Sequence, residues 1–150
     1  MIIYKDIEFN NTGEQLSDNI IDSLNCFWGG SLPFAYKEFL KNVNGGIPNK
    51  DTFIFGDDSS NVDLFFGVTP DKHMNIFKFH NIPKNMIAIG EDAFGNLILL
   101  AVTMQDRGKV YFWDHELACE DDEEPGYENL TLIADSFDKF LSMLKSVDDI

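Results

Sequence analysis

The segment Ile87–Glu116, with the sequence IAIGEDAFGNLILLAVTMQDRGKVYFWDHE, contains three apolar runs separated by two turn signals. The runs are Ile87–Ile89, Leu97–Val102 and Val110–Trp113, and the turn signals are Gly95-Asn96 and Asp106-Arg107-Gly108. The third run is rich in the β-branched and aromatic residues that favour strands. Because Gly tolerates positive φ and because Asn and Asp favour turns, the segment predicts three antiparallel strands joined by tight reversals.

The middle run, Leu97–Val102, contains no polar residue. A run of this length is too short for a typical buried helix, and between two turns it is typical of a strand that is covered on both faces. We therefore expect Leu97–Val102 to be the interior strand of the sheet, and we expect Gly95 or Asn96 to adopt positive φ in the turn before it.

Charge narrows the range of partners. The chain of 150 residues has 26 Asp and Glu against 11 Lys and Arg, which gives a formal charge of -15. An acidic protein repels phosphate, and Arg107, the only arginine, leaves little capacity for bidentate contacts with phosphate or guanine. The sequence thus disfavours direct binding to nucleic acid and favours a basic protein as the partner.

The cysteine pattern and the N-terminal residues bear on location. Cys26 and Cys119 are far apart and form no CxxC pair, so reduced thiols in the cytoplasm are favoured over a disulfide. Charged residues near the N-terminus leave no apolar signal-peptide core, and no run of about 18 apolar residues could span a bilayer. We expect a cytoplasmic protein with no membrane contact.

Three segments have helical periodicity. Thr12-Gly13-Glu14-Gln15 resembles a capping box and predicts a helix over Gly13–Phe27, with an apolar stripe of Leu16, Ile20, Leu24 and Phe27. Pro33 suits the first position of a second helix, whose stripe is Tyr36, Phe39, Leu40 and Val43, and Asn44-Gly45-Gly46 ends it. Asp135-Ser136 predicts the start of a third, whose stripe is Phe137, Phe140, Leu141 and Leu144.

Further strands are predicted outside the central segment. They are Thr52–Phe55, Asp63–Val68 and Leu130–Ala134, with an edge strand or extended lead-in near Ile2–Phe9. Residues 56–61, between the first two of these strands, form a polar loop, and the alternating oxygen donors Asp57, Ser59, Asn61 and Asp63 suggest calcium. Val62 and Val68 stand where a calcium loop needs Gly and a bidentate Glu, so a solvated loop is favoured over a metal site.

Asp114-His115-Glu116 is the most reaction-like cluster, because a His between carboxylates can serve as a base or a ligand. Neighbouring residues in a strand point to opposite faces, so Asp114 and His115 would not converge on one substrate atom. No second catalytic motif accompanies them. We expect no catalysis, no cofactor and no metal.

An acidic run, Glu116–Glu128, follows the third central strand and contains no Lys or Arg. Such runs are usually solvated loops, and a binding surface is the alternative. As part of a partner-binding surface we predict the acidic residues Glu116, Glu120, Asp121, Asp122, Glu123 and Glu124, together with Asp57 and Asp58.

Several motifs in fixed order resemble the SUKH superfamily, which includes the yeast cell-wall regulators related to Smi and Knr and many bacterial immunity proteins. They are Leu32-Pro33-x-x-Tyr36-x-x-Phe39-Leu40, Asn44-Gly45-Gly46, Ile87-x-Ile89-Gly90-x-Asp92-x-x-Gly95-Asn96, Gly108-x-Val110-Tyr111-x-Trp113-Asp114-His115 and Ser136-Phe137-x-x-Phe140-Leu141-x-x-Leu144. The resemblance runs from about residue 32 to residue 144. Each motif alone is short, and the order and spacing make the signal specific.

The resemblance implies an α+β fold with a central, mainly antiparallel β-sheet flanked by helices, which agrees with the elements predicted above; the length and the absence of repeats indicate a single domain. It also implies a binding module that neutralises a cognate toxin, often a nuclease. A regulatory or scaffold module that docks another cellular protein is the alternative. The family's motif residues correspond here to Pro33, Tyr36, Gly45, Gly46, Gly90, Asp92, Gly95, Asn96, Trp113, Asp114 and His115. We expect most of them to be structural, with Trp113 in the core and Asp114 satisfying a backbone donor.

Overall fold

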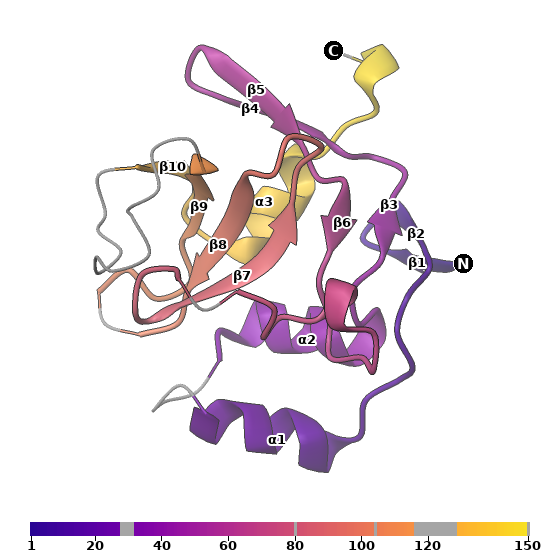
Figure 1. Ribbon diagram of the computed structural model, residues 1–150. Coiled ribbons are helices and arrows are strands. Elements are labelled where there is room, and N and C mark those ends of the chain that lie inside the picture. The colour runs from indigo at the N-terminus through magenta and orange to yellow at the C-terminus, as the bar shows by residue number, and fades with distance from the viewer. Residues whose placement is uncertain (28–31, 80, 104, 116–128, 150) are drawn as a thin grey trace.

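An antiparallel five-stranded sheet forms the centre of the computed structural model, which describes residues 1–27, 32–79, 81–103, 105–115 and 129–149 (Figure 1). In spatial order the strands are β10 (Leu130–Ala134), β9 (Val110–Trp113), β8 (Leu97–Ala101), β7 (Met86–Glu91) and β6 (Leu64–Phe65). The predicted α+β class with a central, mainly antiparallel sheet is confirmed.

The strand β8 occupies the middle of this sheet, as predicted. All five of its residues are buried, and it pairs with β7 and β9 through the two turns, with Leu99 opposite Ala88 and Tyr111. Burial on both faces explains why the run contains no polar residue, because side chains on either face of the sheet are shielded from water.

Leu99 is fully buried in β8, and its truncation to Ala is expected to lower the free energy of unfolding by about 2–5 kcal/mol. The loss combines the transfer free energy of the removed methyl groups with the cavity they leave. Urea unfolding of the wild type and of Leu99→Ala measures it. A loss below about 0.5 kcal/mol would contradict an interior position for this strand.

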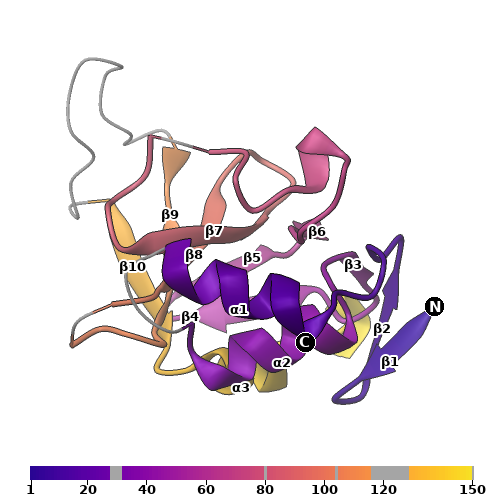
Figure 2. The same ribbon diagram turned by 90° about the horizontal axis from the view of Figure 1, so that it is seen from below.

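Two helices cover one face of the sheet, side by side (Figures 1 and 2). They are α2 (Phe34–Asn42) and α3 (Phe137–Met143). Phe39 of α2 meets Phe65 of β6 and Phe137 of α3 with ring centroids 5.2 and 5.1 Å apart, so helix and sheet share one aromatic core. The opposite face is approached by residues 66–79, which include the 3₁₀ turn η1 (Lys72–Met74) (Figure 2).

The second and third predicted helices are confirmed with their stripes. Tyr36, Phe39, Leu40, Val43, Phe137, Phe140, Leu141 and Leu144 are all buried. Ser136 is the N-cap of α3, and its hydroxyl accepts a hydrogen bond from the backbone N–H of Lys139 at 3.1 Å. Pro33 occupies the N-cap of α2 rather than its first helical position.

The first predicted helix begins later than expected, because α1 covers Asp18–Phe27. The capping box is wrong: the backbone N–H of Gly13 donates to the carbonyl of Asn44 at 3.0 Å, so this backbone is held by a tertiary contact. The Ser17 hydroxyl instead accepts from the N–H of Ile20 at 3.3 Å. The stripe shifts accordingly, since Ile21 is buried and Ile20 is 43% exposed.

Two smaller sheets complete the fold. The first consists of β1 (Ile2–Tyr4), β2 (Ile7–Asn10) and β3 (Ile47–Pro48), so the N-terminal segment forms a hairpin rather than a lead-in. The second is a hairpin of β4 (Thr52–Phe55) and β5 (Asp58–Asn61) that projects from the body (Figure 1). The last described element is the 3₁₀ turn η3 (Val147–Asp149). In the described part of the chain no helix is long and apolar enough to cross a bilayer.

The β4–β5 hairpin corrects two predictions. Residues 56–61 were expected to be a solvated loop, but residues 58–61 pair with β4 along its whole length. The predicted strand Asp63–Val68 is reduced to the two residues of β6. Asp-Ser-Ser-Asn has low strand propensity, and cross-strand pairing with Thr-Phe-Ile-Phe overrides it.

Tyr36 provides a test of the core that depends on pH. Burial raises the pKa of its phenol, and the hydroxyl has no hydrogen-bond partner among the described residues. Above about pH 10 the unfolded state loses this proton first, so stability is fully present below that pH and falls as the pH rises further. Tyr36→Phe is expected to raise the free energy of unfolding at pH 7 by about 1–3 kcal/mol.

The same substitution should reduce the loss of stability above about pH 10 by up to about 1.4 kcal/mol per pH unit, the effect of one proton. Urea unfolding at pH 7 and at several values from about pH 10 upward measures both effects. A lower stability of Tyr36→Phe at pH 7 would mean that the hydroxyl has a hydrogen-bond partner after all.

Candidate partner-binding site

A buried carboxylate, Asp92, organises the turn between β7 and β8. Its Oδ1 atom accepts hydrogen bonds from the backbone N–H groups of Phe94 and Asn96, each at 2.8 Å. Its Oδ2 atom accepts from the Asn96 side-chain amide and from the Ser60 hydroxyl, also at 2.8 Å each. Asp92 is only 3% exposed, so these donors replace its water. The contact to Ser60 fastens the β4–β5 hairpin to the central sheet.

Asn96 extends this network to the end of β9. Its Oδ1 atom accepts from the His115 backbone N–H at 3.1 Å and lies 2.6 Å from His115 Nδ1. Because the amide NH₂ of Asn96 faces the Asp92 carboxylate, its oxygen must face His115, and Nδ1 therefore carries a hydrogen. His115 thus joins β9 to the β7–β8 turn, a structural role for a residue that could have served as a base.

The turn itself has the expected backbone. Gly95 has a φ of +88°, which confirms the expectation at Gly95 rather than Asn96, and a Cβ there would lie 3.8 Å from the His115 ring. Gly45 and Gly46 also have positive φ, and a Cβ at Gly90 would lie 2.9 Å from the Leu64 carbonyl oxygen. These glycines serve turns and close backbone approaches.

Trp113 is 6% exposed, which confirms its place in the core. The neighbouring Asp114 is held through its backbone: its N–H donates to the Asn129 carbonyl at 3.3 Å, and the Asn129 side-chain amide donates to the Asp114 carbonyl at 3.1 Å. Asn129 is itself only 6% exposed. The reciprocal pair fixes the end of β9 against the residue that precedes β10.

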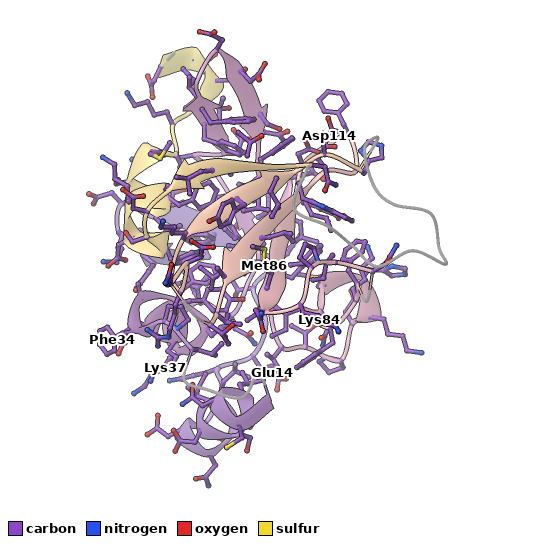
Figure 3. The ribbon with its side chains drawn as sticks, turned by 90° about the vertical axis from the view of Figure 1, so that its left-hand side faces the viewer. Glu14, Phe34, Lys37, Lys84, Met86 and Asp114 are labelled. Atoms are coloured by element: carbon purple, nitrogen blue, oxygen red, sulfur yellow. The ribbon has the colours of Figure 1, made fainter. Side chains whose placement is uncertain are left out.

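Asp114 also lines a cleft of about 290 Å³ between the β4–β5 hairpin and the ends of β9 and β10. Its described lining residues are Phe55, Asp58, Ser59, Phe112, Asp114, Asn129 and Thr131. Figure 3 shows Asp114 in the upper half of the molecule and Glu14 in the lower half, well apart from each other. Asp58 and Asp114, which come from separate elements, thus line one concave surface.

The hairpin tip positions the predicted acidic residues Asp57 and Asp58. Gly56, with a φ of +63°, and Asp57 form the two-residue turn, and Asp58 is exposed opposite Phe55. A glycine at the first turn position is typical of a type II′ hairpin. Asp58 is brought together with Asp114, whereas Glu116, Glu120, Asp121, Asp122, Glu123 and Glu124 lie outside the described residues. Whether these acids bind a partner stays a prediction.

Sequence reasoning missed the other cleft residues: Phe55, Ser59, Phe112, Asn129 and Thr131. The alternation in Thr-Phe-Ile-Phe could have placed Phe53 and Phe55 on one face of β4. The approach of β4 to β9 and β10 is a long-range contact that no local pattern specifies. Within the described residues there is no group of three or more His, Cys, Asp or Glu that could hold a metal ion.

Comparison with known proteins places the chain in a family. A SUKH family model, described as SMI1-KNR4 cell-wall, matches residues 20–141. The chain is also 32% identical to the SPbeta prophage-derived uncharacterized protein YokK of Bacillus subtilis (strain 168), over 89% of this chain and 74% of that protein. The matched region contains the Asp92 network and Asp114. The protein belongs to the SUKH superfamily, in its SMI1-KNR4 family.

Proposed function

We propose that this protein is an immunity protein that binds a basic protein toxin, with a nuclease as the favoured class, and neutralises it. The observation that carries the proposal is the cleft in which Asp58 and Asp114 converge, in a SUKH-family chain with a formal charge of -15. A relative of prophage origin is consistent with a role in competition between genetic elements.

Charge supports this choice of partner. A nuclease active site must attract phosphate, so it carries the positive potential that an acidic protein can occupy. Complementary charge raises association rates by about 10–1,000-fold at low salt. Glu120, Asp121, Asp122, Glu123 and Glu124 follow His115 closely in the sequence, and we propose that they belong to the same binding surface.

The test is co-expression with candidate toxins, taken from the reading frames that flank this gene. We expect wild-type chain to restore growth and to co-purify with the toxin. The double variant Asp58→Asn/Asp114→Asn should protect less well, because it removes two charges from the cleft. Glu14→Gln/Asp22→Asn removes two exposed charges outside the cleft, one in α1 and one just before it, and is the matched control.

Two results would contradict the proposal. One is failure of the wild-type chain to protect cells or to bind any of the candidate toxins. The other is protection by the chain with no complex formed, which would point to an activity on the toxin's product. Co-purification of an unrelated cellular protein in place of the toxin would favour the regulatory or scaffold alternative.

A further inference from the structure

The cleft between the β4–β5 hairpin and the ends of β9 and β10 has the size of a receptor for one side chain. Its volume of about 290 Å³ lies just below the range of about 300–1,000 Å³ that is typical of sites for drug-sized ligands. Asp58, which lines the cleft, is exposed, so within the described residues the cleft reaches the molecular surface. The cleft is therefore large enough to receive one long side chain of a partner protein.

Two aromatic rings give the cleft flat apolar walls. The rings of Phe55 and Phe112 lie 4.9 Å apart between centroids at an angle of 34°. Phe53, which is 1% exposed, lies 5.5 Å from Phe55 and 5.3 Å from Phe140, so the pair is supported from the core. Phe55 and Phe112 themselves are only partly buried. Exposed faces of this kind attract cations, and a planar guanidinium can also stack on them.

Carboxylates complete the lining. Asp58 comes from β5 and Asp114 from the end of β9, and no Lys or Arg lies among the described residues of the cleft. The backbone of Asp114 is clamped by Asn129, and the hairpin that carries Asp58 is tied to the sheet through Ser60 and Asp92. Preorganised groups of this kind lose little conformational freedom when a ligand binds.

We infer that the cleft receives an arginine side chain of the bound toxin, with its guanidinium against Phe55 and Phe112 and its N–H groups paired with Asp114 and Asp58. Arginine fits better than lysine because its fork of donors matches a carboxylate and its plane matches the phenyl rings, whereas an ammonium is a strongly hydrated point charge. This inference rests on the proposed function and names the group of the partner that the cleft recognises.

The test uses the whole chain labelled with ¹⁵N and three capped tripeptides, Gly-Arg-Gly, Gly-Lys-Gly and Gly-citrulline-Gly, followed by NMR. We expect Gly-Arg-Gly to shift the amide signals of Ser59, Asp114, Asn129 and Thr131 in a saturable manner. The lysine peptide should bind about tenfold more weakly, and citrulline, which has the same shape without the charge, should produce no saturable shift.

Substitutions in the cleft test whether Gly-Arg-Gly binds there. Asp114→Asn and Phe55→Leu should each weaken Gly-Arg-Gly binding by about tenfold, whereas Glu14→Gln/Asp22→Asn should leave it unchanged. Unchanged spectra outside the cleft will show that each variant is folded. Equal shifts with the lysine peptide, shifts spread over the acidic surface, or no saturable shift would overturn the inference.

The peptide test needs no toxin, so the two proposals can fail separately. A protein that protects cells but does not bind Gly-Arg-Gly in the cleft retains the proposed function and loses the arginine site. A protein that binds the peptide in the cleft but no toxin retains the site and loses the proposed function.

Discussion

Replacement of Asp92 by Ala is expected to lower the free energy of unfolding by about 3–5 kcal/mol. The Asp92 carboxylate accepts four hydrogen bonds, from Phe94, Ser60 and twice from Asn96. Alanine leaves these donors without an acceptor in a site that is nearly closed to water. It also releases the β4–β5 hairpin from the sheet, so the cleft should loosen.

Asp92→Asn is the matched control, because it keeps the shape of the side chain and removes its charge and one acceptor oxygen. Its remaining carbonyl oxygen can still accept from the two backbone N–H groups, whereas its NH₂ would face the amide of Asn96, so a smaller loss of about 1–2 kcal/mol is expected. Urea unfolding measures both variants, and hydrogen exchange of the β4–β5 amides measures the hairpin. An Ala variant as stable as wild type, with unchanged exchange in the hairpin, would show that the network contributes nothing.

Replacement of Asn44 by Ala is expected to cost a similar amount, about 3–5 kcal/mol. Asn44 is 1% exposed and follows α2. Its side-chain amide donates to the carbonyls of Glu14 at 2.8 Å and Val68 at 3.0 Å, and its Oδ1 atom accepts from the Val68 N–H at 2.8 Å. Alanine would leave three backbone groups unpaired and would have to adopt the φ of +59° that Asn44 has.

Asn44→Gly separates the two causes, because glycine adopts positive φ without strain but makes no side-chain hydrogen bond. We expect Asn44→Gly to recover only about 1 kcal/mol of the loss in thermal or urea unfolding. Full recovery by glycine would mean that backbone conformation, and not the hydrogen bonds to Glu14 and Val68, makes Asn44 important.

Local patterns in the sequence predict much of this fold. The meander of β7, β8 and β9 follows from three apolar runs and two turn signals, and α2 and α3 follow from their apolar stripes. These elements are short-range in sequence, so periodicity and turn chemistry determine them. The resemblance of the motifs to the SUKH superfamily agrees with the family match over residues 20–141.

The elements that were predicted wrongly, and the cleft residues that were not predicted, all depend on contacts between residues far apart in the sequence. The start of α1 moved because Gly13 bonds to Asn44, and residues 58–61 became a strand because β4 lies beside them. The cleft forms because β4 lies close to β9 and β10. Of the residues that line it, the sequence therefore pointed only to Asp58, as a partner-binding residue, and to Asp114, as a motif residue. The hydrogen bonds among Asp92, Asn96 and His115 give these three motif residues a structural role.

The most direct test of the acidic surface is the association rate constant with the cognate toxin, measured by stopped flow at several ionic strengths. For wild-type chain we predict a rate that falls steeply as salt is raised, since screening shortens the range of the attraction. Asp58→Asn/Asp114→Asn, and likewise replacement of Glu120, Asp121, Asp122, Glu123 and Glu124 by Gln or Asn, should slow association at low salt and flatten this dependence. Glu14→Gln/Asp22→Asn should behave almost as wild type. A rate that is independent of salt, and unchanged in both acid-neutralised variants, would contradict recognition of the toxin through this surface.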